Sequence, residues 1–97
     1  MRLDFYMFME IAGQQARQGA TVAVIREGVG CRQQISLTDA EMHDGLKRLT
    51  AAKLIHADGD RYLIAESVVP TLPKTASGKL SFRRQDWDEL RQRLFEM

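Results

Sequence analysis

The single cysteine and the two histidines of this sequence, Cys31, His43 and His56, are of types that commonly act as nucleophiles, proton carriers or metal ligands. A catalytic thiol needs a base and a third group that orients it, and a zinc site needs several clustered ligands. The spacing of these three residues provides neither arrangement. We therefore expect the histidines to be partly buried structural residues and Cys31 to be a small buried core residue. The sequence predicts no enzyme, no metal site and no cofactor.

The composition is that of one ordinary globular domain. The chain has 97 residues, of which 44% are hydrophobic and 28% charged. This composition is too apolar for a disordered chain, and the length suits a single core. The formal net charge of +1 excludes a strong overall field, so any attraction to nucleic acid would need a local basic patch.

Two features predict a location in the cytoplasm. Cys31 is the single cysteine, which excludes an intrachain disulfide and favours a reducing compartment. Asp4 stands where a secretory signal would continue apolar, and no run approaches the roughly 18 apolar residues of a membrane span. We expect neither export nor membrane insertion.

Two helices are predicted in the first third of the chain. Apolar residues at helical spacing predict a buried helix over 3–18, with Gly19 as its stop. Thr21 is a candidate N-cap for a second helix. Gly28 and Gly30 interrupt that second segment, and each costs about 1 kcal/mol of helix propensity. The second helix is therefore expected to be short or irregular.

The strongest local signal marks the start of a third helix. Thr38 can cap the backbone, Glu41 can reach back to it, and Leu37 can pack on Met42. Asp44 precedes Arg48 by four residues, a spacing at which opposite charges pair on a helix surface. The predicted core stripe of this helix consists of Met42, Leu46, Leu49 and Lys53.

A hairpin and a final helix are predicted after the third helix. Strand-like runs over 54–57 and 61–65 flank an Asp-Gly pair at Asp58 and Gly59, which favours a tight turn. Both prolines of the chain fall in 66–85, which predicts an extended connector, and apolar periodicity predicts a helix over 86–96.

The order of three helices and a hairpin resembles the winged-helix family. The segment 46–55, LKRLTAAKLI, is similar to the family's passage from third helix to wing. The resemblance covers about residues 3–65 and implies an α+β winged helix-turn-helix with a three-helix core, a hairpin wing and a C-terminal helix. Lys53 occupies the position at which the family has glycine, which implies a less left-handed helix exit or local strain.

The resemblance also implies a function in binding DNA, as a small transcriptional regulator. In this family the third helix enters the major groove, so Lys47 and Arg48 would contact DNA there and Arg61 would contact it from the wing. Asp39, Glu41 and Asp44 oppose this interaction because they repel phosphate. Further basic residues that could bind phosphate are Lys74, Lys79, Arg83 and Arg84.

An alternative hypothesis remains open, in which the protein binds another protein or a second copy and no DNA. An apolar surface would then form the contact, and the family analogy favours a homodimer through terminal helices. The candidate interface residues are Phe5, Phe8, Trp87, Leu90 and Leu94. Double-stranded DNA and a second copy of the chain are therefore the two expected partners, and no membrane is expected.

Overall fold

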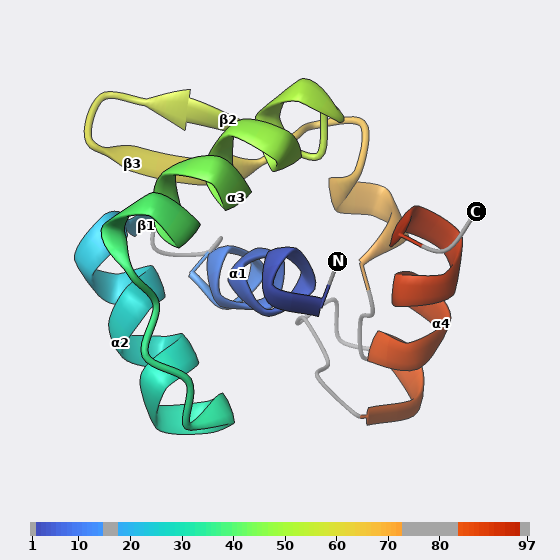
Figure 1. The fold of residues 1–97 in the computed structure, drawn as a ribbon. Helices are drawn as coiled ribbons and strands as arrows, with labels where there is room; N and C mark the ends of the chain where they lie inside the picture. The colour runs from blue at the N-terminus through green and yellow to red at the C-terminus, as the bar shows by residue number, and fades with distance from the viewer. Residues whose placement is uncertain (1, 15–17, 73–83, 96–97) are drawn as a thin grey trace. The chain divides into compact units, whose positions relative to one another are not determined.

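The computed structural model describes residues 2–14, 18–72 and 84–95. Within these residues the protein is α+β, with four α-helices and one three-stranded antiparallel sheet, which confirms the predicted class. The chain divides into two compact units, Met1–Ala65 and Glu66–Met97. The first unit holds α1 to α3 and the whole sheet, and the second holds α4 (Figure 1).

Helix α1 spans Arg2–Gly13 and contacts α2, α3 and β3. Its apolar residues Met7, Phe8 and Ile11 are completely buried, so α1 is the central helix of the first unit. The predicted end at Gln18 is wrong, because the helix stops at Gly13, where glycine is a poor helix former. Residues 15–17 lie outside the described residues.

Helix α2 spans Val22–Gln33 and directly follows the two-residue strand β1, Ala20–Thr21. The predicted cap is confirmed, because the Thr21 hydroxyl accepts a hydrogen bond from the Val24 amide at 3.3 Å. The expectation of a short or irregular helix is wrong, since α2 continues through Gly28 and Gly30 for 12 residues. Tertiary packing on α1 outweighs the local cost of the glycines.

Helix α3 spans Asp39–Ala51 and begins with the predicted capping box. Thr38 accepts from the Glu41 amide at 3.1 Å, and the Glu41 carboxylate accepts from the Thr38 amide at 3.0 Å. The predicted core residues Met42, Leu46 and Leu49 are buried, but Lys53 is exposed because the helix has already ended. Lys53 adopts φ +61°, so the exit from the helix is left-handed and the predicted alternative of local strain at this non-glycine residue is confirmed.

The sheet has the strand order β1-β3-β2. The predicted hairpin is confirmed: β2, Ile55–Asp58, and β3, Arg61–Ile64, pair antiparallel across a two-residue turn. Gly59 opens this turn with φ +64°, a conformation that favours glycine. Ile55 and Ile64 pair at the buried end of the hairpin, whereas residues 56–61 are exposed.

In the second unit, a short 3-10 helix, Val69–Thr71, is followed after the undescribed segment by α4, Arg84–Phe95. The predicted final helix is confirmed, and it begins two residues earlier than expected. Val68, Leu72 and Leu90 are buried. No described helix is long and apolar enough to cross a membrane.

Candidate functional site

The outer face of α3 carries one exposed lysine among acidic neighbours. Lys47 and Asp44 are both exposed, as is His43 on the preceding turn. No hydrogen bond or ion pair within the described residues occupies the Lys47 ammonium group. Lys47 is therefore available to a negatively charged partner, while Asp44 weakens the positive potential around it.

Arg48 is held by a residue of another helix. Its Nε and Nη2 atoms donate to the two carboxylate oxygens of Asp4 on α1, both at 2.8 Å. The predicted ion pair between Arg48 and Asp44 is wrong, because Arg48 donates its hydrogen bonds to Asp4. Asp44 contributes only a longer-range electrostatic attraction to Arg48. The hydrogen bond to Asp4 raises the pKa of Arg48. This two-point pairing ties α3 to α1 and leaves less of the guanidinium for DNA.

The hairpin presents both signs of charge. Arg61 lies at the start of β3, and its Nη1 donates to the backbone carbonyl of Gly19 at 3.4 Å. Asp58 and Asp60 flank the turn and are exposed. The hairpin tip is therefore acidic, and Arg61 is partly engaged with the segment before β1.

The other predicted basic residues belong to the second half of the chain. Lys74, Lys79 and Arg83 lie outside the described residues, and Arg84 is the first residue of α4. Of the predicted interface residues, Phe5, Phe8 and Leu90 are buried, with at most 4% of their surface exposed. Trp87 and Leu94 lie in α4. Of the predicted basic residues, Lys47 and Arg48 are therefore neighbours on α3, and Arg61 lies on β3, where it contacts Gly19.

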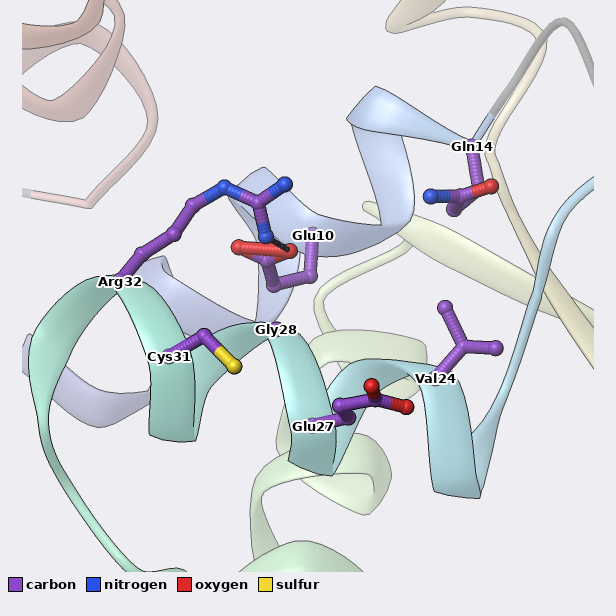
Figure 2. A pocket seen from close by; sticks show the side chains of 7 residues that line it. All are labelled: Glu10, Gln14, Val24, Glu27, Gly28, Cys31 and Arg32. Carbon is purple, nitrogen blue, oxygen red and sulfur yellow. Dashed lines mark hydrogen bonds and ion pairs between the residues drawn. The ribbon is translucent and has the colours of Figure 1, made fainter.

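A second candidate site is a pocket between α1 and α2, with a volume of about 490 Å³ (Figure 2). The sequence analysis did not predict it. The residues that line this α1–α2 pocket are Glu10, Gln14, Val24, Glu27, Gly28, Cys31 and Arg32. Cys31 is exposed, so the expectation of a buried core thiol is wrong.

An ion pair with a buried carboxylate and an exposed arginine lies at the wall of this pocket. Arg32 Nη1 on α2 lies 2.5 Å from Glu10 Oε1 on α1, and the Glu10 side chain is only 10% exposed. Burial raises the pKa of Glu10, and the charge of Arg32 opposes this shift in part. A Cβ atom at position 28 would overlap the Glu10 carboxylate. Glycine at that position therefore makes room for the pair.

The two histidines differ from expectation as well. His43 and His56 are both exposed, so the prediction that they are partly buried is wrong. Within the described residues, no three His, Cys, Asp or Glu side chains are grouped so that they could hold a metal ion.

Comparison with protein-family models, with curated proteins and with solved structures finds no significant match to this chain. Functional inference therefore depends on the residues themselves. Asp4 and Glu10 are the residues that sequence reasoning missed. The available signal was the presence of two acidic residues in an otherwise apolar helix, since a buried carboxylate requires a partner.

Proposed function

We propose that this chain is a winged-helix DNA-binding protein of the transcriptional-regulator type, with α3 as the helix that enters the major groove. The observation that carries the proposal is the element order, in which β1, α2, α3, β2 and β3 follow one another and the sheet has the order β1-β3-β2. The hairpin supports it, because its base is buried and its tip is exposed as a wing requires.

Lys47 is the residue of α3 best suited to a phosphate contact. It is exposed, and no described side chain competes for its ammonium group. Arg48 acts mainly as a positioning residue in this proposal, because Asp4 already accepts two of its hydrogen bonds. Arg61 would add a contact from the wing, and Lys74, Lys79, Arg83 and Arg84 remain predicted phosphate contacts.

The test is the salt dependence of binding to random-sequence duplex DNA, measured by fluorescence anisotropy. The wild type is expected to bind at low salt and to lose affinity steeply as salt rises. Lys47→Gln should reduce the slope of log affinity against log salt by about one. Arg93→Gln is the matched control: it removes one exposed positive charge from α4, and it should leave the slope unchanged.

A second variant tests the same face in the opposite direction. Asp44→Asn removes a carboxylate that would lie near phosphate if α3 enters the groove. This substitution should tighten DNA binding at low salt. An unchanged affinity in both Lys47→Gln and Asp44→Asn would contradict a role of α3, and the absence of any binding by the wild type at low salt would contradict the proposed function.

The charge balance favours a second candidate function, the binding of a protein partner. Residues 1–65 contain eight Lys or Arg and eight Asp or Glu, so this unit has a formal net charge of zero. The start of α3 and the hairpin tip are acidic, which suits a partner with a basic surface. The acidic residues concerned are Glu41, Asp44, Asp58 and Asp60, together with Asp39, whose carboxylate pairs with Arg26 at 2.5 Å.

Light scattering on the purified protein separates the homodimer from other partners. Phe5, Phe8 and Leu90 are buried, so these three predicted interface residues offer no apolar surface to a second copy. A monomer that also fails to bind DNA would favour a different protein as partner. A concentration-dependent dimer would favour self-association.

A further inference from the structure

The α1–α2 pocket has the size of a small-ligand site and a mostly polar lining. Its volume of about 490 Å³ is within the usual range for small-molecule pockets. It lies on α2 and α1 and does not include Lys47 or Asp44 of α3. The pocket is therefore separate from the face of α3 that is proposed to bind DNA.

The charged groups of the pocket do not balance. Its lining contains two carboxylates, Glu10 and Glu27, and one guanidinium, Arg32. Arg32 contacts Glu10 through a single Nη1–Oε1 pair, whereas Glu27 is exposed and has no described partner. One negative charge of the lining is therefore uncompensated within the described residues, and a ligand with one positive charge would balance it.

The pocket lining combines carboxylates with one exposed apolar side chain. Position 28 has no side chain, and the Glu10 carboxylate occupies the place that a Cβ there would take, so glycine lets this carboxylate pack against α2 at the pocket lining. Val24 is 37% exposed, unusually high for a large apolar residue of this protein, and it lines the same pocket. Figure 2 shows Val24 and Glu27 on α2, and the Glu10 side chain of α1 directed toward Arg32.

We propose that the α1–α2 pocket binds a small organic cation with an ammonium group and a short aliphatic chain. The ammonium group pairs with Glu27, and the aliphatic chain packs on Val24. Gln14 can accept or donate a further hydrogen bond to a polar group of the ligand.

Cys31 provides a direct measure of occupancy. It is the single cysteine of the chain, it is exposed, and it lines the pocket. A bound ligand should therefore slow its reaction with a thiol-specific disulfide reagent. The probes are n-butylammonium chloride and sodium butyrate at equal ionic strength, which present the same four-carbon chain with opposite charges. A small free thiol in parallel reactions corrects for direct effects of each probe on the reagent.

The expected result is that n-butylammonium slows modification of Cys31 in a saturable manner and that butyrate does not. Glu27→Gln should weaken this protection several-fold. Glu89→Gln removes an exposed carboxylate from α4 and should have no effect. Each variant is compared with itself in the absence of probe, and amide chemical shifts at Glu27 and Gly28 provide a second measure of binding.

Three outcomes would overturn the proposal. Equal protection by butyrate would mean that the pocket does not select a positive charge. Protection that is unchanged in Glu27→Gln would mean that this carboxylate does not bind the ammonium group. An absence of both protection and chemical-shift change at saturating probe would mean that the pocket binds no such ligand.

Discussion

Helix α1 is joined to α2 and to α3 by two ion pairs with the same components but different surroundings. Each pair has a buried carboxylate on α1, an arginine on the other helix, and a glycine near that arginine. Glu10 pairs with Arg32, with Gly28 four residues before the arginine. Asp4 pairs with Arg48, with Gly45 three residues before it. The glycines allow a carboxylate to lie close to the helix that carries its partner.

The two pairs differ in how completely the carboxylate is satisfied. Both oxygens of Asp4 accept a hydrogen bond at 2.8 Å from Arg48. Glu10 has a single contact, at 2.5 Å, and its arginine is 62% exposed beside an open pocket. The first pair thus joins α3 to α1 through two hydrogen bonds, whereas the carboxylate of Glu10 on α1 accepts one hydrogen bond from α2. We interpret the first pair as structural and the second as part of a binding site.

The largest effect is expected from removal of the arginines. Arg48→Gln leaves Asp4 buried without its two hydrogen bonds, and loss of one partner of a buried pair is strongly destabilising. Arg32→Gln should cost less, because Glu10 can turn toward the pocket and water. Urea denaturation of both variants measures this difference. An equal loss of unfolding free energy would remove the distinction between the two pairs.

The glycines test the same distinction with a smaller effect. In Gly45→Ala the new methyl group would lie 2.6 Å from Met7 Sδ, in the core, so we expect a loss of about 1–3 kcal/mol. In Gly28→Ala the Glu10 carboxylate can move into the pocket, and alanine adds about 1 kcal/mol of helix propensity. The unfolding free energy of Gly28→Ala should therefore stay near that of the wild type.

The measurement for both glycine variants is denaturant unfolding, with circular dichroism to verify that the helices form. Gly13→Ala is the matched control, since a Cβ there has no neighbour within 4 Å. An equal destabilisation by Gly28→Ala and Gly45→Ala would contradict this prediction. It would mean that the Glu10 carboxylate cannot move away from a methyl group at position 28.

The pH dependence of stability should come from Glu10. Because burial raises its pKa in the folded protein, the folded state holds the proton more tightly than the unfolded chain does. Stability from this group is complete at a pH below its ordinary pKa and is lost as the pH rises through the raised value. Relative to the wild type, Glu10→Gln should therefore gain stability as the pH increases across the weakly acidic range.

Unfolding free energies of the wild type and of Glu10→Gln, measured at several pH values, test this sign. Glu27→Gln is the control, because it alters an exposed carboxylate of the same pocket. A relative stability of Glu10→Gln that fell with increasing pH would show that Arg32 stabilises the charged carboxylate more than burial destabilises it.

The smallest change in stability is expected from a substitution at the end of α3, which does not alter either ion pair. Lys53 has φ +61°, a conformation that is unfavourable for any residue with a Cβ. Lys53→Gly should raise the unfolding free energy by up to about 1 kcal/mol. Lys53→Ala removes the charged side chain but keeps the strained backbone. Comparing the melting temperatures of the two variants therefore distinguishes the effect of the charge from that of the backbone conformation. A melting temperature of Lys53→Gly below that of the wild type would show that the backbone at Lys53 does not destabilise the protein.

The elements that follow from local chemistry could be predicted from the sequence. Thr38 and Glu41 predicted the start of α3, and the Asp58-Gly59 pair predicted the hairpin. The two-residue strand β1 was missed because it is too short to show an alternating pattern. The regular course of α2 could not be predicted either, since the reason for Gly28 is a carboxylate on another helix.

The sites depend on contacts between residues that are distant in the sequence. Arg48 and Asp4 are separated by 44 positions, so helical spacing suggested the nearer Asp44 as partner. The α1–α2 pocket likewise combines Glu10 and Arg32, which are 22 positions apart. Lys47 was identified correctly as a charged residue of α3, but its role in DNA binding stays a prediction.

The strand order has a consequence for how this protein behaves at high concentration. With β3 in the centre, β2 is an edge strand, and in the part of the chain that the structure describes it has no second neighbour. An exposed edge can pair with the edge of another molecule and start an aggregate. Here the edge is four residues long and ends at the charged, exposed Asp58. Replacing Asp58 by a neutral residue would therefore be expected to increase edge-to-edge pairing of β2 between molecules.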